Sequence, residues 1–249
     1  MFVAGDLSAG AEAVLSPGQA HYLRNVMRQA PGAGVRLFNG RDGEWLAELR
    51  QLGKRDGRAA VTTRLRPQPA EPDLWLLFAP IKRGPLELLV QKATELGAAR
   101  LQPAVSRFTD AARINVERLQ SIATEAAEQC ERLSVPLIAP AAPLSRLLDD
   151  WPADRSLLFC DERGGPPLAG QLETPGPARP AAILVGPEGG FADDERDRLL
   201  AQPCVRPVSL GPRTLRAETA AIAALALWQA LAGDGRPGAP GLASPRGIR

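Results

Sequence analysis

The spacing of apolar residues changes near residue 72 and separates two kinds of predicted element. Before it, apolar and polar residues alternate over 35–39, 44–50 and 58–65, which is typical of half-buried strands. The turn-rich link 40–43 favours a hairpin between the first two, and only residues 21–29 have helical spacing. The first 70 residues are therefore predicted to form a small β-rich barrel or sandwich.

After residue 72, short apolar runs alternate with segments of helical periodicity. We predict strands at 74–79, 100–104, 135–138, 156–160, 181–185 and 205–210, and helices at 85–96, 115–133, 193–201 and 217–231. Such alternation is typical of a mostly parallel sheet with helices on its faces.

The domain boundary is predicted in residues 66–72, where three prolines indicate a stiff linker. We predict a β-rich domain at 1–69 and an α/β domain at 70–232. Residues 233–249 are rich in glycine and proline and are predicted to be a disordered tail. The G-x-G-x-x-G pattern at 233–238 follows a helix rather than a strand, so it does not indicate a dinucleotide site.

Composition narrows the class of protein. The longest apolar runs are far shorter than the roughly 20 residues of a membrane helix, and the first ten residues do not resemble a signal peptide. Three scattered cysteines and one histidine favour neither a disulfide framework nor a metal site. We expect a cytoplasmic protein without metal. Residues 1–70 carry 10 basic and 6 acidic side chains, an excess that reflects either chance or an anionic partner such as nucleic acid.

Two glycine-rich loops follow predicted strands of the second domain. Gly186-Pro187-Glu188-Gly189-Gly190-Phe191 follows the strand at 181–185, and Gly211-Pro212-Arg213-Thr214-Leu215-Arg216 follows the strand at 205–210. Ligands bind at the carboxyl ends of strands in open parallel sheets, and glycine lets the main chain approach a ligand closely. One such loop is commonly only a turn. Two of them, expected at adjacent strand ends, favour a site that holds a small cofactor by main-chain groups.

These loops carry a resemblance to a known family. Residues 184–191 and 210–220 resemble the signature pair of the SPOUT RNA methyltransferases, and more narrowly the small-subunit ribosomal RNA (uracil-N3)-methyltransferases. The resemblance implies an α+β protein, with an N-terminal PUA-like β-barrel and a C-terminal α/β SPOUT domain that contains a trefoil knot. It also implies a homodimer, S-adenosylmethionine as cofactor, and small-subunit ribosomal RNA or the assembled small subunit as partner.

The resemblance also assigns residues to the cofactor and to catalysis. The cofactor would be held around Leu184, Val185, Gly186, Pro187, Glu188, Gly190, Leu210, Gly211 and Leu215. Arg216 would stabilise charge on the uracil oxygens, or would instead pair with Glu218. Glu218 would be catalytic, or would only complement the helix dipole. Glu188 would contact the positive end of the cofactor, or would cap the following helix. The general base stays open between a carboxylate and a water.

RNA contacts are expected on both domains. The candidates are Arg24, Asn25 and Arg28 on one helical face, Lys82 and Arg107 near strand ends, and Glu128 and Arg132 four residues apart on the long helix. Glu128 and Arg132 could equally be a surface ion pair. Few aromatic side chains are available for base stacking, since Tyr22 is the only tyrosine and Trp45 is expected in the core. Recognition is therefore expected to depend on backbone charge and RNA shape.

The sequence thus predicts S-adenosylmethionine-dependent methylation of uracil N3 in small-subunit (16S) ribosomal RNA. One alternative is a non-catalytic RNA-binding factor for ribosome assembly on the same fold. The other is a SPOUT methyltransferase that modifies another base or a ribose hydroxyl.

Overall fold

The structure is a computed structural model that describes residues 1–109, 114–172 and 179–236. Contacts divide the chain into two compact units. The first unit comprises residues 1–70 and 127–135, and the second unit comprises 71–126 and the chain from 136 onward. Most of the predicted tail, residues 237–249, lies outside the described residues. Within the described ranges, no helix is both long and apolar enough to cross a membrane.

The first unit is built on a four-stranded antiparallel sheet with the order β1-β4-β3-β2. Its strands are β1 (Glu12–Leu15), β2 (Gly34–Phe38), β3 (Glu44–Leu52) and β4 (Gly57–Arg66). The predicted hairpin is confirmed as β2 and β3. Gly40 and Gly43 in its link both have positive φ, which suits glycine. Trp45, which was expected in the core, is partly buried and packs against the buried cluster around Leu37 and Leu49.

The helical segment of the first unit differs from the predicted helix at 21–29. Helix α1 (Pro17–His21) begins earlier, after a capping box formed by Ser16 and Gln19. It continues as the π-helix η1 (Tyr22–Val26), in which the Met27 amide donates to the Tyr22 carbonyl at 3.0 Å. A π-helix bonds residues five apart, so the spacing used to place its side chains on one α-helical face does not apply.

The second unit contains a seven-stranded sheet with the order β11-β9-β10-β5-β6-β7, and β8 also pairs with β6. Its strands are β5 (Leu74–Phe78), β6 (Arg100–Val105), β7 (Leu137–Ile138), β8 (Ala142–Pro143), β9 (Ser156–Cys160), β10 (Ala181–Val185) and β11 (Val205–Val208). Each pairing is parallel, so the predicted parallel sheet is confirmed. All carboxyl ends of the strands therefore lie at one edge of the sheet.

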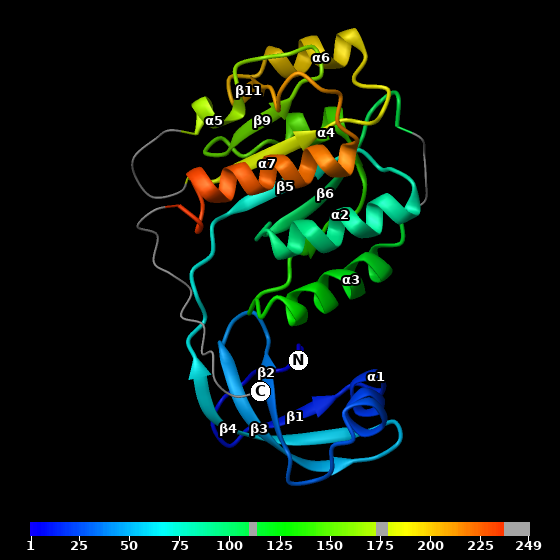
Figure 1. The fold of residues 1–249 in the computed structure, drawn as a ribbon, viewed down its shortest axis with the longest axis vertical. Helices are drawn as coiled ribbons and strands as arrows, with labels where there is room; N and C mark the ends of the chain where they lie inside the picture. The colour runs from blue at the N-terminus through cyan, green and yellow to red at the C-terminus, as the bar shows by residue number, and fades with distance from the viewer. Residues whose placement is uncertain (110–113, 173–178, 237–249) are drawn as a thin grey trace. The chain divides into compact units, whose positions relative to one another are not determined.

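Helices cover both faces of this sheet (Figure 1). They are α2 (Arg83–Glu95), α3 (Val116–Gln129), α4 (Leu144–Asp149), α5 (Leu168–Gln171), α6 (Asp193–Leu200) and α7 (Ala217–Leu231). Helices α4 and α6 pack on the face that includes Leu77, Phe159 and Leu184. Helices α2 and α7 lie side by side over the opposite face. Helix α3 ends at Gln129, four residues before the predicted end, and Glu131 shortly after it has φ 59°.

Residues 127–135, at the end of α3 and beyond it, complete the first unit. Leu133 and Ala127 are buried with Phe38, and Phe2 packs against the same cluster. The Phe2 amide donates to Glu128 Oε1 at 2.8 Å. This contact gives Glu128 a structural partner within the first unit.

The Glu87 carboxyl on α2 should make the folding stability of the second unit depend on pH in the acid range. Hydrogen bonds from Arg118 on α3 and from Arg83 lower the pKa of the Glu87 carboxyl from its ordinary 4.5 to about 2. A lowered pKa stabilises the folded state at pH values above about 4.5, and this contribution is lost as the pH falls through about 2. The free energy of unfolding measured with urea should therefore differ between the wild type and Glu87→Gln at pH 7. This difference should shrink as the pH falls from about 4.5 to about 2.

The matched control is Glu117→Gln on α3. In the described part of the chain, the Glu117 carboxylate forms no ion pair, so this change should alter the free energy of unfolding at pH 7 by less than Glu87→Gln does. A Glu87→Gln effect that stayed constant down to pH 2 would contradict the assignment.

Candidate functional site

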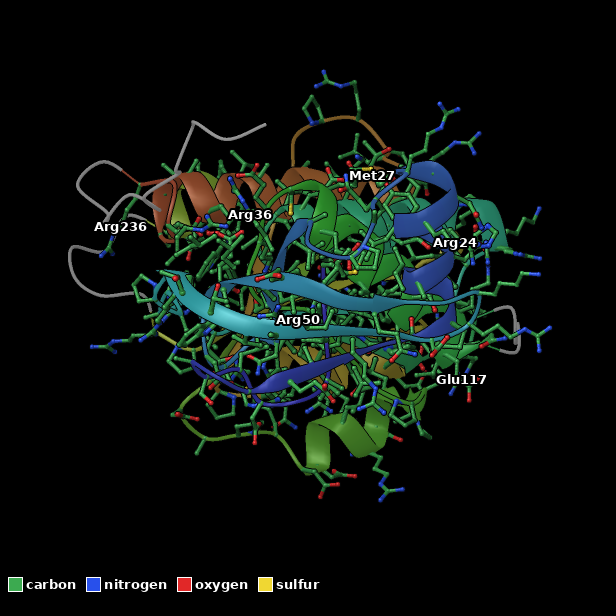
Figure 2. The ribbon with its side chains drawn as sticks, turned by 90° about the horizontal axis from the view of Figure 1, so that it is seen from below. Arg24, Met27, Arg36, Arg50, Glu117 and Arg236 are labelled. Atoms are coloured by element: carbon green, nitrogen blue, oxygen red, sulfur yellow. The ribbon has the colours of Figure 1, made fainter. Side chains whose placement is uncertain are left out.

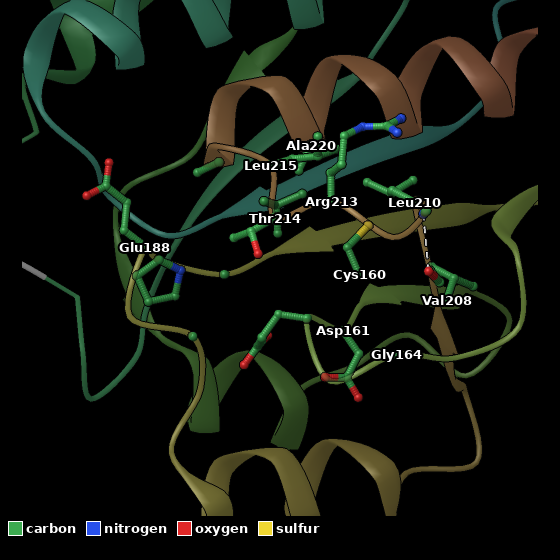
Figure 3. A pocket seen from close by; sticks show the side chains of 18 of the residues that line it. Cys160, Asp161, Gly164, Glu188, Val208, Leu210, Arg213, Thr214, Leu215 and Ala220 are labelled. Atoms are coloured by element: carbon green, nitrogen blue, oxygen red, sulfur yellow. Dashed lines mark hydrogen bonds between the residues drawn. The ribbon is translucent and has the colours of Figure 1, made fainter.

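A cavity of about 350 Å³ lies at the carboxyl ends of β9, β10 and β11 (Figure 3). Its volume is in the range of small-molecule sites, and its place is where open parallel sheets bind ligands. Three loops and the start of α7 form its wall. The lining residues are Cys160, Asp161, Glu162 and Gly164 from the end of β9, Val185 to Gly190 from the end of β10, Val208 to Leu215 from the end of β11, and Ala217 and Ala220 of α7.

The two predicted loops are both at the cavity, but their strands are not adjacent. Strand β9 lies between β10 and β11 and pairs with both. The expectation of adjacent strand ends was therefore wrong, because chain order does not specify lateral order in a sheet. The loop after β9 is a third wall that the sequence interpretation missed. Its signal was the acidic pair Asp161-Glu162 directly after a buried strand.

The loop after β10 requires glycine at two positions. A Cβ added to Gly186 would lie 2.5 Å from Cε2 of Phe191, whose ring packs edge-to-face on Phe159 with centroids 5.3 Å apart. Gly190 has φ 70°, and the Glu162 carboxylate occupies the space that a Cβ would need. The main chain of this loop therefore approaches both its own aromatic ring and the loop after β9.

The loop after β9 is fixed to helix α6 by two ion pairs. The Asp161 side chain has no exposed surface, and Arg196 donates to it through Nε at 3.0 Å and Nη2 at 2.8 Å. Arg163 pairs with Asp193 at 2.6 Å. Burial raises the pKa of the neighbouring Cys160 thiol to about 12. The thiol therefore stays protonated at neutral pH and is not a nucleophile there.

The loop after β11 brings apolar side chains and the hydroxyl groups of Ser209 and Thr214 to the cavity. Leu210 and Leu215 lie on its wall, and Figure 3 labels Thr214 next to Leu215. Gly211 has φ 110°, and its amide donates to Ser209 Oγ at 3.2 Å, the dashed line in that figure. The loop runs directly into α7, whose N-cap residue is Arg216.

Most residues predicted to hold the cofactor are brought together at this cavity. Those that line it are Val185, Gly186, Pro187, Glu188, Gly190, Leu210, Gly211 and Leu215. Leu184 does not, because its side chain is buried on the sheet face that packs against α4 and α6. Glu188 is exposed and does not cap α6, since Glu195 bonds the amide of the N-cap residue Ala192 at 3.2 Å.

Arg216 and Glu218, predicted as catalytic, flank the cavity rather than line it. Arg216 is exposed between Leu215 and Ala217, which both line the wall. Glu218 is half-buried in the first turn of α7. Across the ranges that the structure describes, neither side chain forms an ion pair, so the alternative of an Arg216–Glu218 pair is not found.

The residues predicted to contact RNA have different surroundings. Arg24, Asn25 and Arg28 are exposed in the first unit, where Figure 2 labels Arg24 on the helical segment. Asn25 bonds His21 Nδ1 at 2.8 Å. Lys82 is exposed at the start of α2.

Arg107, Glu128 and Arg132 already have protein partners. Arg107 pairs with Asp194 at 2.6 Å, and Arg132 Nε donates to Ser134 Oγ at 2.9 Å. Glu128 accepts a hydrogen bond from the Phe2 amide at 2.8 Å.

The chemistry of the wall fits S-adenosylmethionine. Val185, Leu210 and Leu215 offer apolar surface for a flat ring, and the glycines give the ligand close access to main-chain groups. Glu162 and Glu188 are carboxylates that suit a positively charged ligand. Among the described residues, no group of three or more histidine, cysteine or acidic side chains could hold a metal ion.

Comparisons with known proteins agree with this geometry. The model of an RNA methyltransferase domain matches residues 68–229, and that of an RNA methyltransferase PUA domain matches residues 15–59. The ribosomal RNA small subunit methyltransferase E of Rickettsia conorii is 35% identical over 211 residues, which cover 83% of this chain and 84% of the relative. The protein of the same name from Synechocystis is 33% identical over 236 residues, 93% of this chain and 77% of the relative.

Solved structures show the same fold. The crystal structure of a ribosomal RNA small subunit methyltransferase E from Neisseria gonorrhoeae, bound to S-adenosyl methionine, matches with a TM-score of 0.82. The two proteins are 28% identical, and the match covers 94% of this chain and 98% of that one.

Proposed function

This chain belongs to the family of the ribosomal RNA small subunit methyltransferases E, and on that basis we propose that it methylates N3 of a uracil in small-subunit ribosomal RNA. The methyl donor is S-adenosylmethionine. The observation that carries the proposal is the cavity at the ends of β9, β10 and β11, whose wall is made largely from the two loops that resemble the family's signature.

The chain's own residues would hold the donor in that cavity. S-adenosylmethionine supplies a methyl group carried on a positively charged sulfonium. Val185, Leu210 and Leu215 would bind its apolar ring, while main-chain groups of the glycine-rich loops bind polar atoms. Glu162 and Glu188 place negative charge at the cavity, which favours binding of a cation over binding of a neutral ligand.

Arg216 would act on the RNA base. Methyl transfer to uracil N3 requires removal of the imide proton and stabilisation of charge on the carbonyl oxygens. Arg216 follows a cavity-lining residue, is exposed and has no ion-pair partner among the described residues, so its guanidinium is available to donate to such an oxygen. Glu218 is the nearest carboxylate in sequence and is proposed to assist the proton transfer.

RNA binding and assembly complete the proposal. Arg24 and Arg28 in the first unit and Lys82 in the second unit are exposed cations that suit phosphates, and Asn25 follows Arg24 in the sequence. Arg107, Glu128 and Arg132 would contact RNA only by exchanging their protein partners.

The homodimer and the trefoil knot stay predictions from the resemblance, and we also propose a cytoplasmic location. Analytical ultracentrifugation of the full chain tests the dimer.

Transfer of labelled methyl groups tests the function. Wild-type protein should move label from S-adenosylmethionine to small ribosomal subunits that lack the modification, and nucleoside mass spectrometry should identify N3-methyluridine. Arg216→Ala should lower kcat by about 10²- to 10³-fold, the usual effect of removing one charge-stabilising donor. Affinity for S-adenosylmethionine should stay within about threefold. Arg146→Ala, an exposed arginine on α4, is the matched control and should retain wild-type activity.

The alternatives give different results in the same assay. Label on another base or on ribose would keep the donor but overturn the assignment to uracil N3. Absence of both label and S-adenosylmethionine binding would favour a non-catalytic assembly factor.

A further inference from the structure

Phe108 is an exposed aromatic side chain beside the cavity. It follows β6, whose carboxyl end lies at the same edge of the sheet as that of β10, and 52% of its surface is exposed. A Cβ added to Gly189 would lie 3.4 Å from the Phe108 Cβ, so Phe108 contacts the loop that lines the cavity. The sequence interpretation did not select this residue.

The turn that carries Phe108 is held on both sides. Thr109 Oγ1 accepts from the Ser106 amide at 2.9 Å and lies 2.9 Å from Ser106 Oγ. On α6, Glu195 Oε1 accepts from the Arg107 amide at 2.8 Å, and Asp194 pairs with the Arg107 guanidinium. The main chain around Phe108 is therefore fixed by contacts within the turn and with α6, while about half of the Phe108 surface is exposed.

A single exposed apolar side chain is normal on a protein surface and needs no partner. Phe108 differs because it adjoins the cofactor cavity and because its turn is preorganised. An unpaired nucleobase is the group that stacks on such a ring in RNA-binding proteins. Enzymes that modify a base also remove it from its own stack before the reaction, which leaves its face open to a side chain.

We propose that Phe108 stacks on an unpaired base of the RNA substrate and so positions the target nucleotide at the cavity. This inference rests on the proposed function, because it takes RNA as the substrate. The sequence alone predicted that RNA recognition depends on backbone charge and RNA shape. A stack on Phe108 would add a contact to the face of a base. Stacking tolerates any base, so Phe108 would fix position rather than select sequence.

Substitution of Phe108 tests the stack. Phe108→Ala should lower kcat/KM for RNA by about 5- to 140-fold, the usual range for one base–aromatic stack. Phe108→Trp should stay within about threefold of wild type, because the larger ring also stacks. Affinity for S-adenosylmethionine and the thermal midpoint should not change in either variant. Leu137→Ala removes a similarly exposed apolar side chain from β7 and should have no effect on kcat/KM.

RNA affinity measured by fluorescence anisotropy at several salt concentrations separates stacking from charge. Phe108→Ala should weaken binding while leaving the slope of log affinity against log salt unchanged, since no phosphate contact is lost. Unchanged kcat/KM and RNA affinity in Phe108→Ala would overturn the proposal. A shift of Phe108→Ala to a smaller species in ultracentrifugation, with RNA affinity per subunit retained, would also overturn it and would place the ring against a second copy of the chain.

Failure of the proposed function is distinguishable from failure of this inference. If the wild type transferred no label to RNA, the function would fail, and the anisotropy comparison would still decide whether Phe108 binds a base.

Discussion

Replacing Gly186 with alanine should weaken S-adenosylmethionine binding by about 5- to 140-fold. The added Cβ would lie 2.5 Å from Cε2 of Phe191, a ring that is only 3% exposed and is packed against Phe159. Because the ring has no room to withdraw, the loop after β10 must move, and this loop lines the cavity. Overpacking of this kind costs about 1–3 kcal/mol, and each 1.4 kcal/mol is about tenfold in affinity. Isothermal titration calorimetry measures the change.

Two further variants make this result specific. Gly84→Ala in the first turn of α2 is the control, because a Cβ there meets nothing within 4 Å, and it should bind as the wild type. Adding Phe191→Leu to Gly186→Ala removes the ring atoms that clash and should recover part of the affinity. A folded Gly186→Ala protein with wild-type affinity would show that the loop does not bind the cofactor.

The second large effect is expected at Arg155, at the opposite edge of the same sheet. Its buried guanidinium donates to the main-chain oxygens of Asp73 and Ala181, each at 3.0 Å, and pairs with the Asp73 carboxylate. It also lies 3.7 Å from the centroid of the Trp75 ring. These groups stand where β5, β9 and β10 begin, so one side chain joins three strands.

Arg155→Met should lower the free energy of unfolding by about 2–4 kcal/mol. Breaking a buried ion pair costs about 3–5 kcal/mol, and this value is reduced here because the Asp73 side chain is 50% exposed and can be hydrated. Loss of the cation–π contact adds up to about 2 kcal/mol. Urea unfolding followed by tryptophan fluorescence measures the change.

Arg146→Met, at an exposed arginine on α4, is the comparison and should change stability by less than about 0.5 kcal/mol. Arg155→Met should still bind S-adenosylmethionine with wild-type affinity while folded, because the cavity lies at the other ends of the strands. Equal stability of the two variants would show that the Arg155 contacts contribute nothing.

Local patterns in the sequence predicted the second sheet and two of the three loops at its site. Strands such as β5, β9 and β10 are continuous apolar runs, and glycine with proline marks the loops. Several short strands and helices were not predicted. Strand β1 and helices α4 and α5 have only 4 to 6 residues, too few for their periodicity to be recognised.

What the sequence did not predict depends on contacts between distant segments. The placement of β9 between β10 and β11 is a property of the sheet and not of any one strand. Arg107 was expected to meet RNA, but its partner Asp194 is 87 residues away along the chain. Phe108 was not predicted as a site residue for the same reason. Its position beside the cavity depends on its contact with Gly189, which is distant in the sequence.

The composition of the first unit has a consequence for how the chain folds as it is synthesised. Phe2 and Phe38 are made early, but Ala127 and Leu133, which complete their apolar cluster, are translated about ninety residues after Phe38. In the nascent chain, the apolar surface at Phe2 and Phe38 therefore stays exposed to solvent until residue 135 has left the ribosome. An N-terminal fragment that ends at the interdomain linker lacks residues 127–135. Its apolar surface would stay uncovered, and the fragment would be prone to aggregation.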